Sequence, residues 1–418
     1  MKLHGFFSLC ILCLCPCLFL AGCGSQAAAL AQGSAFFPAQ ADDFASEFPP
    51  DYLGAFDTSP DFPGNLTSVT TQPTTTSTTQ ALSTTTTTTT TQAPVTTTAP
   101  YVPEIKRITL CAAGDCTLGT DTSFYQATSL PGVFKESGDP RYLFKNVEAY
   151  FLDADYTIVN LETTFTLSEQ RIKKKGKPAF FFKGDPELAN SLALAGVDAV
   201  NIANNHIGDY GEQGYLDTVN TLDNLGIGHF DYGNIHYAKI QGVSFAFLGY
   251  TGWGANWWEL AENIARLKDE GYIVVVNFHW GEQNVYAPDA AQIDIARYTI
   301  DQGADLIIGH HPHVLQGAEK YNGKYIFYSL GNFCYGGHSN PDDKDSAIIQ
   351  TVFTFADDVL EGITPRIIPC KISSVPDRND YCPTPATGDE GQRIIDKISS
   401  YSINGLTFDA DGLDADKT

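Results

Sequence analysis

PELANSLALAGVDAVNIANNH, residues 186–206, carries a helix pattern and a strand pattern in immediate succession. In PELANSLALAGV the apolar side chains recur at the spacing of a helix, and DAVNIANNH begins with the short apolar run of a buried strand. The strand pattern ends in Asn204, Asn205 and His206. Because strands that alternate with helices are typical of α/β folds, this stretch predicts an α/β architecture.

The same alternation continues through the chain from residue 101 onward. Further strands are predicted at residues 105–115, 155–162, 243–250, 272–281, 304–313 and 325–333. Further helices are predicted at residues 211–226, 258–270 and 289–303. Later residues indicate a β-meander at 346–358 and 362–373 and a closing helix at 388–402. Together these elements predict an α/β (α+β layered) domain over residues 101–385, followed by a C-terminal helix and tail over 386–418.

The N-terminus has the pattern of an export signal. Lys2 precedes the apolar run GFFSLCILCLCPCLFL, which is followed by LAGC at residues 20–23. LAGC resembles a bacterial lipobox, which implies that residues 1–22 are a lipoprotein signal peptide and that lipid is attached to Cys23. The alternative is an ordinary secretory signal that ends in a cysteine. The lipobox interpretation predicts a lipid-anchored protein on the extracellular face of the bacterial cell membrane.

Two segments separate this signal from the predicted domain. Residues 23–65 show no lasting period and are predicted to be disordered. Residues 66–100 are more than half threonine and carry few of the large apolar side chains that a core requires. We expect a stalk there that holds the domain away from the membrane and spans the cell wall.

Composition excludes some classes of function. The formal net charge of −24 and the isoelectric point near 4.5 exclude nucleic acid as a partner, because its phosphates would be repelled. Beyond Cys23 the cysteines lack the spacing of a metal motif, although Cys370 and Cys382 could form a disulfide.

The most informative pattern is the polar residue that follows each predicted strand. The strand ends carry Asp115, Glu162, Asn204, Asn205, His206, His279, His310, His311 and His313. In open α/β sheets, ligand sites form where the carboxyl ends of strands converge. Oxygen and imidazole ligands without cysteine suit divalent ions such as Mn, Fe or Zn. The sequence therefore predicts a metal site at this rim.

Six motifs make the chain similar to a known family. They are AAGDCTLG, VNLE, ANNHIGDYG, NFHWG, GHHPHVLQG and YSLGNF, in this order between residues 112 and 333. In that order and context they resemble the CapA-type capsule-synthesis proteins of bacteria, which act in poly-γ-glutamate capsules and are similar to calcineurin-like metallophosphoesterases. The resemblance covers about residues 105–375.

This resemblance implies a β-sandwich of two mixed sheets flanked by helices, with two divalent metal ions. By motif, the implied metal ligands are Asp115, Glu162, Asn205, His279, His311 and His313, with Glu162 as the bridge. His310 is expected outside the ligand set. His206 occupies the position of the proton donor, and Asp209 is expected to orient it or contact substrate. Two departures stand out: Thr117 replaces the usual histidine of the first motif, and Glu162 replaces an aspartate.

The function that this resemblance implies is a surface-anchored hydrolase of capsule biosynthesis that cleaves a phosphoester or amide bond. The expected partners are an anionic capsular polymer or its precursor and membrane-bound capsule synthesis or export proteins. The alternatives are a non-hydrolytic accessory factor and a polymer anchor. The basic stretch RIKKKGK at 171–177 fits either an anion-binding segment or a solvated turn. The aromatic loop GWGANWW at 252–258 fits either a substrate contact or simple packing.

Overall fold

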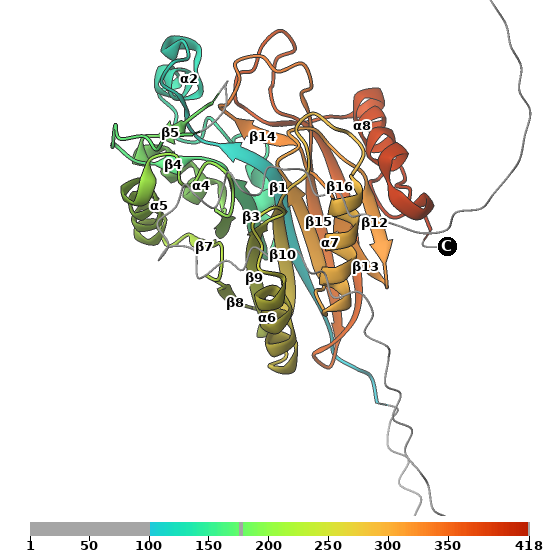
Figure 1. The fold of residues 1–418 in the computed structure, drawn as a ribbon. Coiled ribbons are helices and arrows are strands. Elements are labelled where there is room, and N and C mark those ends of the chain that lie inside the picture. The colour runs from blue at the N-terminus through green and yellow to red at the C-terminus, as the bar shows by residue number, and fades with distance from the viewer. Residues whose placement is uncertain (1–100, 175–178, 417–418) are drawn as a thin grey trace, which may run out of the picture. The chain divides into compact units, whose positions relative to one another are not determined.

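The computed structural model describes residues 101–174 and 179–416 (Figure 1). The predicted signal peptide, lipid site, disordered segment and stalk lie outside the described residues, as do the last three residues of the basic stretch, 175–177. No helix within the described ranges has the length and apolarity to cross a membrane.

Three mixed sheets are formed by the described residues. The largest has the strand order β17 (Thr384–Pro385), β16 (Val359–Lys371), β15 (Asp345–Ala356), β1 (Ile105–Thr117), β3 (Tyr156–Leu161), β6 (Ala199–Asn201) and β7 (Gly228–Phe230), with β14 (Asn332–Tyr335) paired to β1. The second has the order β12 (Ala318–Tyr321), β13 (Lys324–Phe327), β11 (Leu306–His310), β10 (Ile273–His279), β9 (Val243–Thr251) and β8 (His236–Ile240). A small third sheet joins β2 (Thr120–Asp121), β5 (Phe182–Gly184) and β4 (Thr164–Phe165).

The two larger sheets pack their inner faces together, because one apolar cluster contains Leu110 and Ile158 from the first sheet and Phe247 and Val275 from the second. Alternation along β1 sends its other side chains, such as Cys111, to the opposite face. That face is covered by α2 (Leu130–Ser137), α3 (Glu148–Leu152), α4 (Asn190–Ala195) and α5 (Gly211–Leu225). The outer face of the second sheet is covered by α6 (Trp257–Asp269) and α7 (Ala290–Asp301) (Figure 1). With α8 (Gly388–Tyr401), the described ranges hold seven α-helices, so the prediction of a mixed α/β protein is confirmed.

The stretch 186–206 forms a helix followed by a strand, with shifted boundaries. A 3-10 turn at Pro186–Ala189 begins the helix, and Gly196 ends it at a φ of 84°, a conformation that glycine adopts without steric cost. Strand β6 ends at Asn201, earlier than predicted. The remaining residues form turns, because the Asn204 carboxamide accepts the backbone N–H groups of His206 and Ile207.

One predicted strand proves to be two. YIFYSLGNF begins in β13 of the second sheet and ends in β14 of the first, so the prediction of a single strand at 325–333 was wrong. Gly331, at a φ of 66°, redirects the chain between the sheets. At this crossing an added Cβ on Gly114 would stand 2.1 Å from the Gly331 carbonyl oxygen, so the two backbones are in direct contact. The crossing places Asn332 opposite Asp115 in the β1–β14 pair.

All five cysteines within the described ranges are free and buried. The disulfide considered between Cys370 and Cys382 is therefore absent. Burial raises the pKa of both thiols, to about 12 and about 11, which keeps them protonated and unreactive near neutrality.

Helix α8 is tied to strand β15 by a partly buried ionic cluster. Arg393 donates to both carboxylate oxygens of Asp345 at 2.8 and 2.7 Å, and Lys397 donates to the same carboxylate at 3.0 Å. Burial opposes ionisation of Asp345, but these two cations outweigh it and hold its pKa below the ordinary value. A carboxylate whose pKa is depressed by folding stabilises the fold above the unfolded-state pKa and loses that effect as the pH falls through the lower, folded-state pKa.

We therefore expect Asp345→Asn to lower the free energy of unfolding by about 1.5–3 kcal/mol at pH 7, the range for hydrogen bonds to charged groups. The difference from wild type should shrink as the pH falls below about 4. Denaturant titration at several pH values measures this. Glu390→Gln serves as the control, because it breaks the more exposed ion pair between Glu390 of the same helix and Lys371 of β16. It should change the free energy of unfolding by less than about 1 kcal/mol. Equal effects of the two variants would contradict the assignment.

Candidate metal centre

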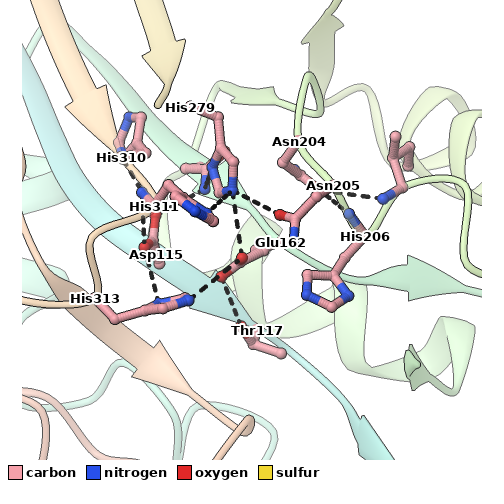
Figure 2. A network of polar contacts seen from close by, with 12 residues as sticks. Asp115, Thr117, Glu162, Asn204, Asn205, His206, His279, His310, His311 and His313 are labelled. Atoms are coloured by element: carbon pink, nitrogen blue, oxygen red, sulfur yellow. Dashed lines mark hydrogen bonds and ion pairs between the residues drawn. The ribbon is translucent and has the colours of Figure 1, made fainter. Parts of the chain in front are cut away.

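The polar residues at the strand ends meet at one rim of the two larger sheets (Figure 2). Asp115 lies near the end of β1, Glu162 directly follows β3, His279 ends β10, and His311 and His313 follow β11. Asn205 lies in the turns after β6. The sheets bring all six predicted ligands to one place, because parallel strands end at the same edge.

Three of these residues each place an atom near one nitrogen of His279, and together with His279 they form one half of the group. His279 Nε2 lies 2.8 Å from Asn205 Oδ1, 3.0 Å from His311 Nδ1 and 3.5 Å from Glu162 Oε1. Around an ion with bonds of about 2.1 Å, neighbouring ligands stand about 3.0 Å apart in an octahedron and about 3.4 Å apart in a tetrahedron. The separations in this group match those of ligands that share one metal ion.

The other two predicted ligands, Asp115 and His313, form the second half of the group. His313 Nδ1 is 3.4 Å from Asp115 Oδ2, and His313 Nε2 is 3.8 Å from Glu162 Oε1. Glu162, His311 and His313 each offer a ligand atom, and these atoms lie within 4.8 Å of one another. Glu162 is thus the residue shared by both halves, and the buried Glu–His–His group could hold a metal ion.

The donor chemistry of the group fits a divalent cation. Glu162 is fully buried, and its Oε1 accepts no hydrogen bond, although it faces imidazoles at 3.5 and 3.8 Å. A buried carboxylate oxygen without a donor is costly unless a cation compensates it. Thr117, at the position of the usual histidine, reaches only Glu162 Oε2 with its hydroxyl, at 3.4 Å. One half of the centre therefore has fewer ligands than the other.

The charges of the group favour the protonation states that metal binding requires. Burial opposes ionisation of Asp115, but His310 and His313 outweigh it and hold the pKa of Asp115 well below its ordinary value. Burial and the neighbouring histidines hold the pKa of both His279 and His311 well below the ordinary value, so both rings are neutral, as metal ligands must be.

Glu162 and His313 form a coupled pair within this group. Burial raises the pKa of Glu162 to about 7. Burial would lower the pKa of His313, but the Glu162 and Asp115 carboxylates outweigh it and raise that pKa to about 9. A proton on His313 thus supplies the positive charge that the two carboxylates require, and a divalent cation held by this group would displace that proton.

The backbone of the His–Pro–His segment is held in an unusual conformation. His311 and His313 have φ values of 95° and 60°, in the left-handed region that few non-glycine residues adopt. The His311 N–H donates to Asp115 Oδ2 at 3.3 Å, and the Asn284 N–H donates to the Pro312 carbonyl at 2.8 Å. Such strain persists where surrounding contacts fix it, and it directs both imidazoles toward Glu162.

His206 and Asp209 form a pair beside this group rather than part of it. His206 Nδ1 lies 2.7 Å from Asp209 Oδ2, which also accepts the Phe182 backbone N–H at 2.7 Å. The His206 ring packs on the Phe182 ring, with 4.4 Å between the ring centroids. The carboxylate orients the imidazole through Nδ1, which leaves Nε2 as the nitrogen available for proton transfer.

Comparison with known proteins identifies the family of this chain. The model of the family described as bacterial capsule synthesis protein PGA_cap matches residues 109–336, slightly more than half of the chain. The chain belongs to the PGA_cap family. The matched region contains every predicted metal ligand and both members of the His206–Asp209 pair.

Among its relatives, capsule biosynthesis protein CapA of Bacillus anthracis is 34% identical over 235 residues, which cover 50% of this chain and 57% of that protein. PGA biosynthesis protein CapA of Bacillus subtilis (strain 168) is 35% identical over 231 residues, covering 50% and 60%. A probable polyglutamine synthesis accessory protein of Mycobacterium tuberculosis is 26% identical over 257 residues, covering 52% and 66%. The chain thus spans less than two thirds of the length of each of these relatives.

Several residues that contact the predicted ligands of this PGA_cap protein were not predicted. Asn160 Nδ2 donates to Asp115 Oδ1 at 2.8 Å and lies 3.4 Å from His279 Nδ1. Asn332 Oδ1 lies 2.9 Å from His313 Nδ1. His310, by contrast, was predicted at this rim but outside the ligand set, and its Nδ1 lies 3.4 Å from Asp115 Oδ1. Asn160 and Asn332 belong to the motifs VNLE and YSLGNF, so motif membership was the one available signal.

The aromatic loop contributes both to the site and to packing. The Trp253 ring stands edge-on to His311 and His279, at centroid distances of 4.9 and 6.1 Å. Trp257 packs on Phe278, and Trp258 is 62% exposed. Trp253 therefore forms a wall of the metal centre, while its loop neighbours pack or face solvent.

Proposed function

We propose that this chain is a metal-dependent hydrolase of capsule and PGA biosynthesis, with the fold of the metallophosphoesterases. The observation that carries the proposal is the group of oxygen and imidazole atoms of Asn205, His311 and Glu162 around His279 Nε2, whose separations from that nitrogen of 2.8, 3.0 and 3.5 Å suit the ligands of one ion. The two packed mixed sheets with helices outside support the fold assignment.

In this proposal the site holds two divalent ions, of Mn, Fe or Zn. One ion would lie among Glu162, Asn205, His279 and His311, and the other among Asp115, Glu162 and His313. Ions so held would lower the pKa of a water and polarise the phosphoryl or carbonyl group that it attacks.

The chain's own residues would then act on the leaving group. His206, with Nδ1 fixed by Asp209 at 2.7 Å, would donate a proton from Nε2 to the departing oxygen or nitrogen. The Asp209 carboxylate would stabilise the imidazolium form that this donation requires. Trp253 would restrict the access of substrate and solvent on the side of His311.

The proposed substrate is an anionic capsular polymer, or its precursor, cleaved at a phosphoester or amide bond. Relatives named for capsule and PGA biosynthesis support this class. Arg171 and Lys173 are exposed, and although Arg171 donates to Thr122 and lies over the Phe181 ring, the segment presents positive charge to an anionic chain. Membrane-bound capsule proteins are the proposed partners. The proposed location is the extracellular membrane face, with lipid on Cys23, and recovery of the chain in the membrane fraction is the measurement for it.

A non-hydrolytic accessory role is the second candidate. It is favoured by Thr117, whose hydroxyl donates a hydrogen bond to Glu162 at the position where the metallophosphoesterases have an imidazole. The mycobacterial relative is also named an accessory protein.

The test combines metal analysis with hydrolysis and binding assays on the purified full chain. We expect about two divalent ions per chain and turnover of a generic phosphodiester or of poly-γ-glutamate, both abolished by a chelator and restored by the ion. Poly-γ-glutamate should bind better than a neutral polymer of equal length. Bound metal without turnover would favour the accessory role, and absence of bound metal would overturn the metal assignment.

A further inference from the structure

Lys174 lies in the basic stretch but is directed into the protein. Its side chain is 16% exposed, and its ammonium forms an ion pair with Asp209 Oδ1. The same ammonium donates to the Phe180 carbonyl at 3.0 Å and to the Asn205 carbonyl at 3.4 Å. A solvated turn does not describe this residue, because its charge is used inside the fold.

These contacts link Lys174 to both parts of the proposed site. Asp209 is fully buried, and its other oxygen holds His206 Nδ1 at 2.7 Å. The Lys174 ammonium also lies 3.4 Å from His206 Nδ1. Asn205, whose carbonyl it contacts, carries a predicted metal ligand in its side chain. One cation therefore contacts the backbone of a ligand and the carboxylate that orients the proposed proton donor.

We propose that Lys174 is a positioning residue, which fixes the Asp209 carboxylate and through it the orientation of the His206 imidazole. The proposal rests on the proposed function insofar as His206 acts on substrate. A buried carboxylate with a cationic partner on one oxygen has its other oxygen in a defined place, whereas an unpaired one rotates or recruits water. Removing Lys174 would thus misplace the imidazole without removing any metal ligand.

Lys183 provides a matched comparison in the same region. Its side chain is similarly buried, at 15% exposed, and its ammonium also pairs with a carboxylate. That carboxylate belongs to Glu169, which is 82% exposed and belongs neither to the His206–Asp209 pair nor to the predicted metal ligands. Substitution of Lys183 therefore tests the loss of a partly buried lysine without the loss of the Asp209 contact.

The experiment compares Lys174→Gln, Lys174→Arg and Lys183→Gln in the full chain. For Lys174→Gln we expect kcat to fall by about 10–100-fold, the range for residues that support a site from outside it, with little change in KM or in metal bound at saturating ion. Lys174→Arg keeps a charge against Asp209 and should recover part of kcat. Lys183→Gln should match wild type.

A second readout is independent of turnover. With ¹⁵N-labelled histidine, the Nδ1 hydrogen of His206 can be assigned by its loss in His206→Gln, and its exchange with water can be measured. We expect faster exchange in Lys174→Gln than in Lys183→Gln. Equal exchange rates and equal kcat in these two variants would overturn the inference.

The readouts separate the two proposals. If wild type binds metal but turns over no substrate, the proposed hydrolase fails, and the exchange rate alone decides the role of Lys174. If Lys174→Gln does not fold, Lys174→Arg decides: an altered exchange rate with unchanged metal supports positioning. Wild-type exchange and turnover in Lys174→Arg would then reduce Lys174 to a charge needed for stability and overturn the inference.

Discussion

Replacing His311 and His313 together by alanine is expected to abolish divalent metal binding and to lower turnover by at least about 10³-fold. The two imidazoles lie on different halves of the group, with His311 beside His279 at 3.0 Å and His313 beside Asp115 at 3.4 Å. Their loss would leave each half with oxygen ligands and at most one imidazole, too few to hold a transition metal tightly. Elemental analysis and calorimetric titration with Mn²⁺ and Zn²⁺ measure the effect.

The control for this pair is His338→Ala. His338 is exposed and its side chain accepts the Asn340 N–H, while its contact with Asn379 is made by the backbone carbonyl, so loss of the imidazole should leave metal content and turnover unchanged. Alanine at the left-handed positions 311 and 313 also carries a backbone cost. His279→Ala, in the regular strand β10, avoids that cost and should still lower affinity at its half of the centre. Full metal content in the double variant would refute the ligand assignment.

Much of this site was predictable because of where strands end. Apolar periodicity located β1, β3, β10 and β11, and a polar residue follows each of these apolar runs. The rule that the carboxyl ends of parallel strands converge was then enough to place these polar residues together. Asp115, Glu162, His279 and His311 were found in this way without any knowledge of their distances. The rule works because parallel pairing fixes which end of each strand faces the rim.

The contacts around these ligands could not be predicted in the same way. Asn332 reaches His313 only because the chain leaves one sheet at Gly331 and enters the other beside β1, which the continuous apolar pattern of YIFYSLGNF conceals. Lys174 illustrates a second limit, since a run of basic residues does not indicate which one turns inward. Its place depends on the buried Asp209 carboxylate, 35 residues further along the chain. Both contacts depend on tertiary structure, so local sequence carries no record of them.

His206→Gln is expected to retain the metal ions and to lower kcat by about 10²–10⁴-fold, the usual contribution of a positioned acid or base. The imidazole contacts Asp209, Lys174 and Phe182, none of which is a predicted metal ligand. Metal content should therefore match wild type. His229→Gln is the matched control, because His229 also pairs with an aspartate, Asp223, at 3.2 Å. Asp223 is 62% exposed, and neither residue belongs to the proposed site.

The leaving group distinguishes a proton donor from a residue that only supports the fold. If His206 protonates the departing atom, the loss of kcat in His206→Gln should be large for an alkyl phosphodiester, whose alkoxide departs poorly without a proton. The loss should be small for a nitrophenyl ester, whose anion departs unaided. A merely structural histidine would slow both substrates equally, because a distorted site affects attack in each. A parallel fall in metal content would instead place His206 among the ligands, and the proton would have to come from another group.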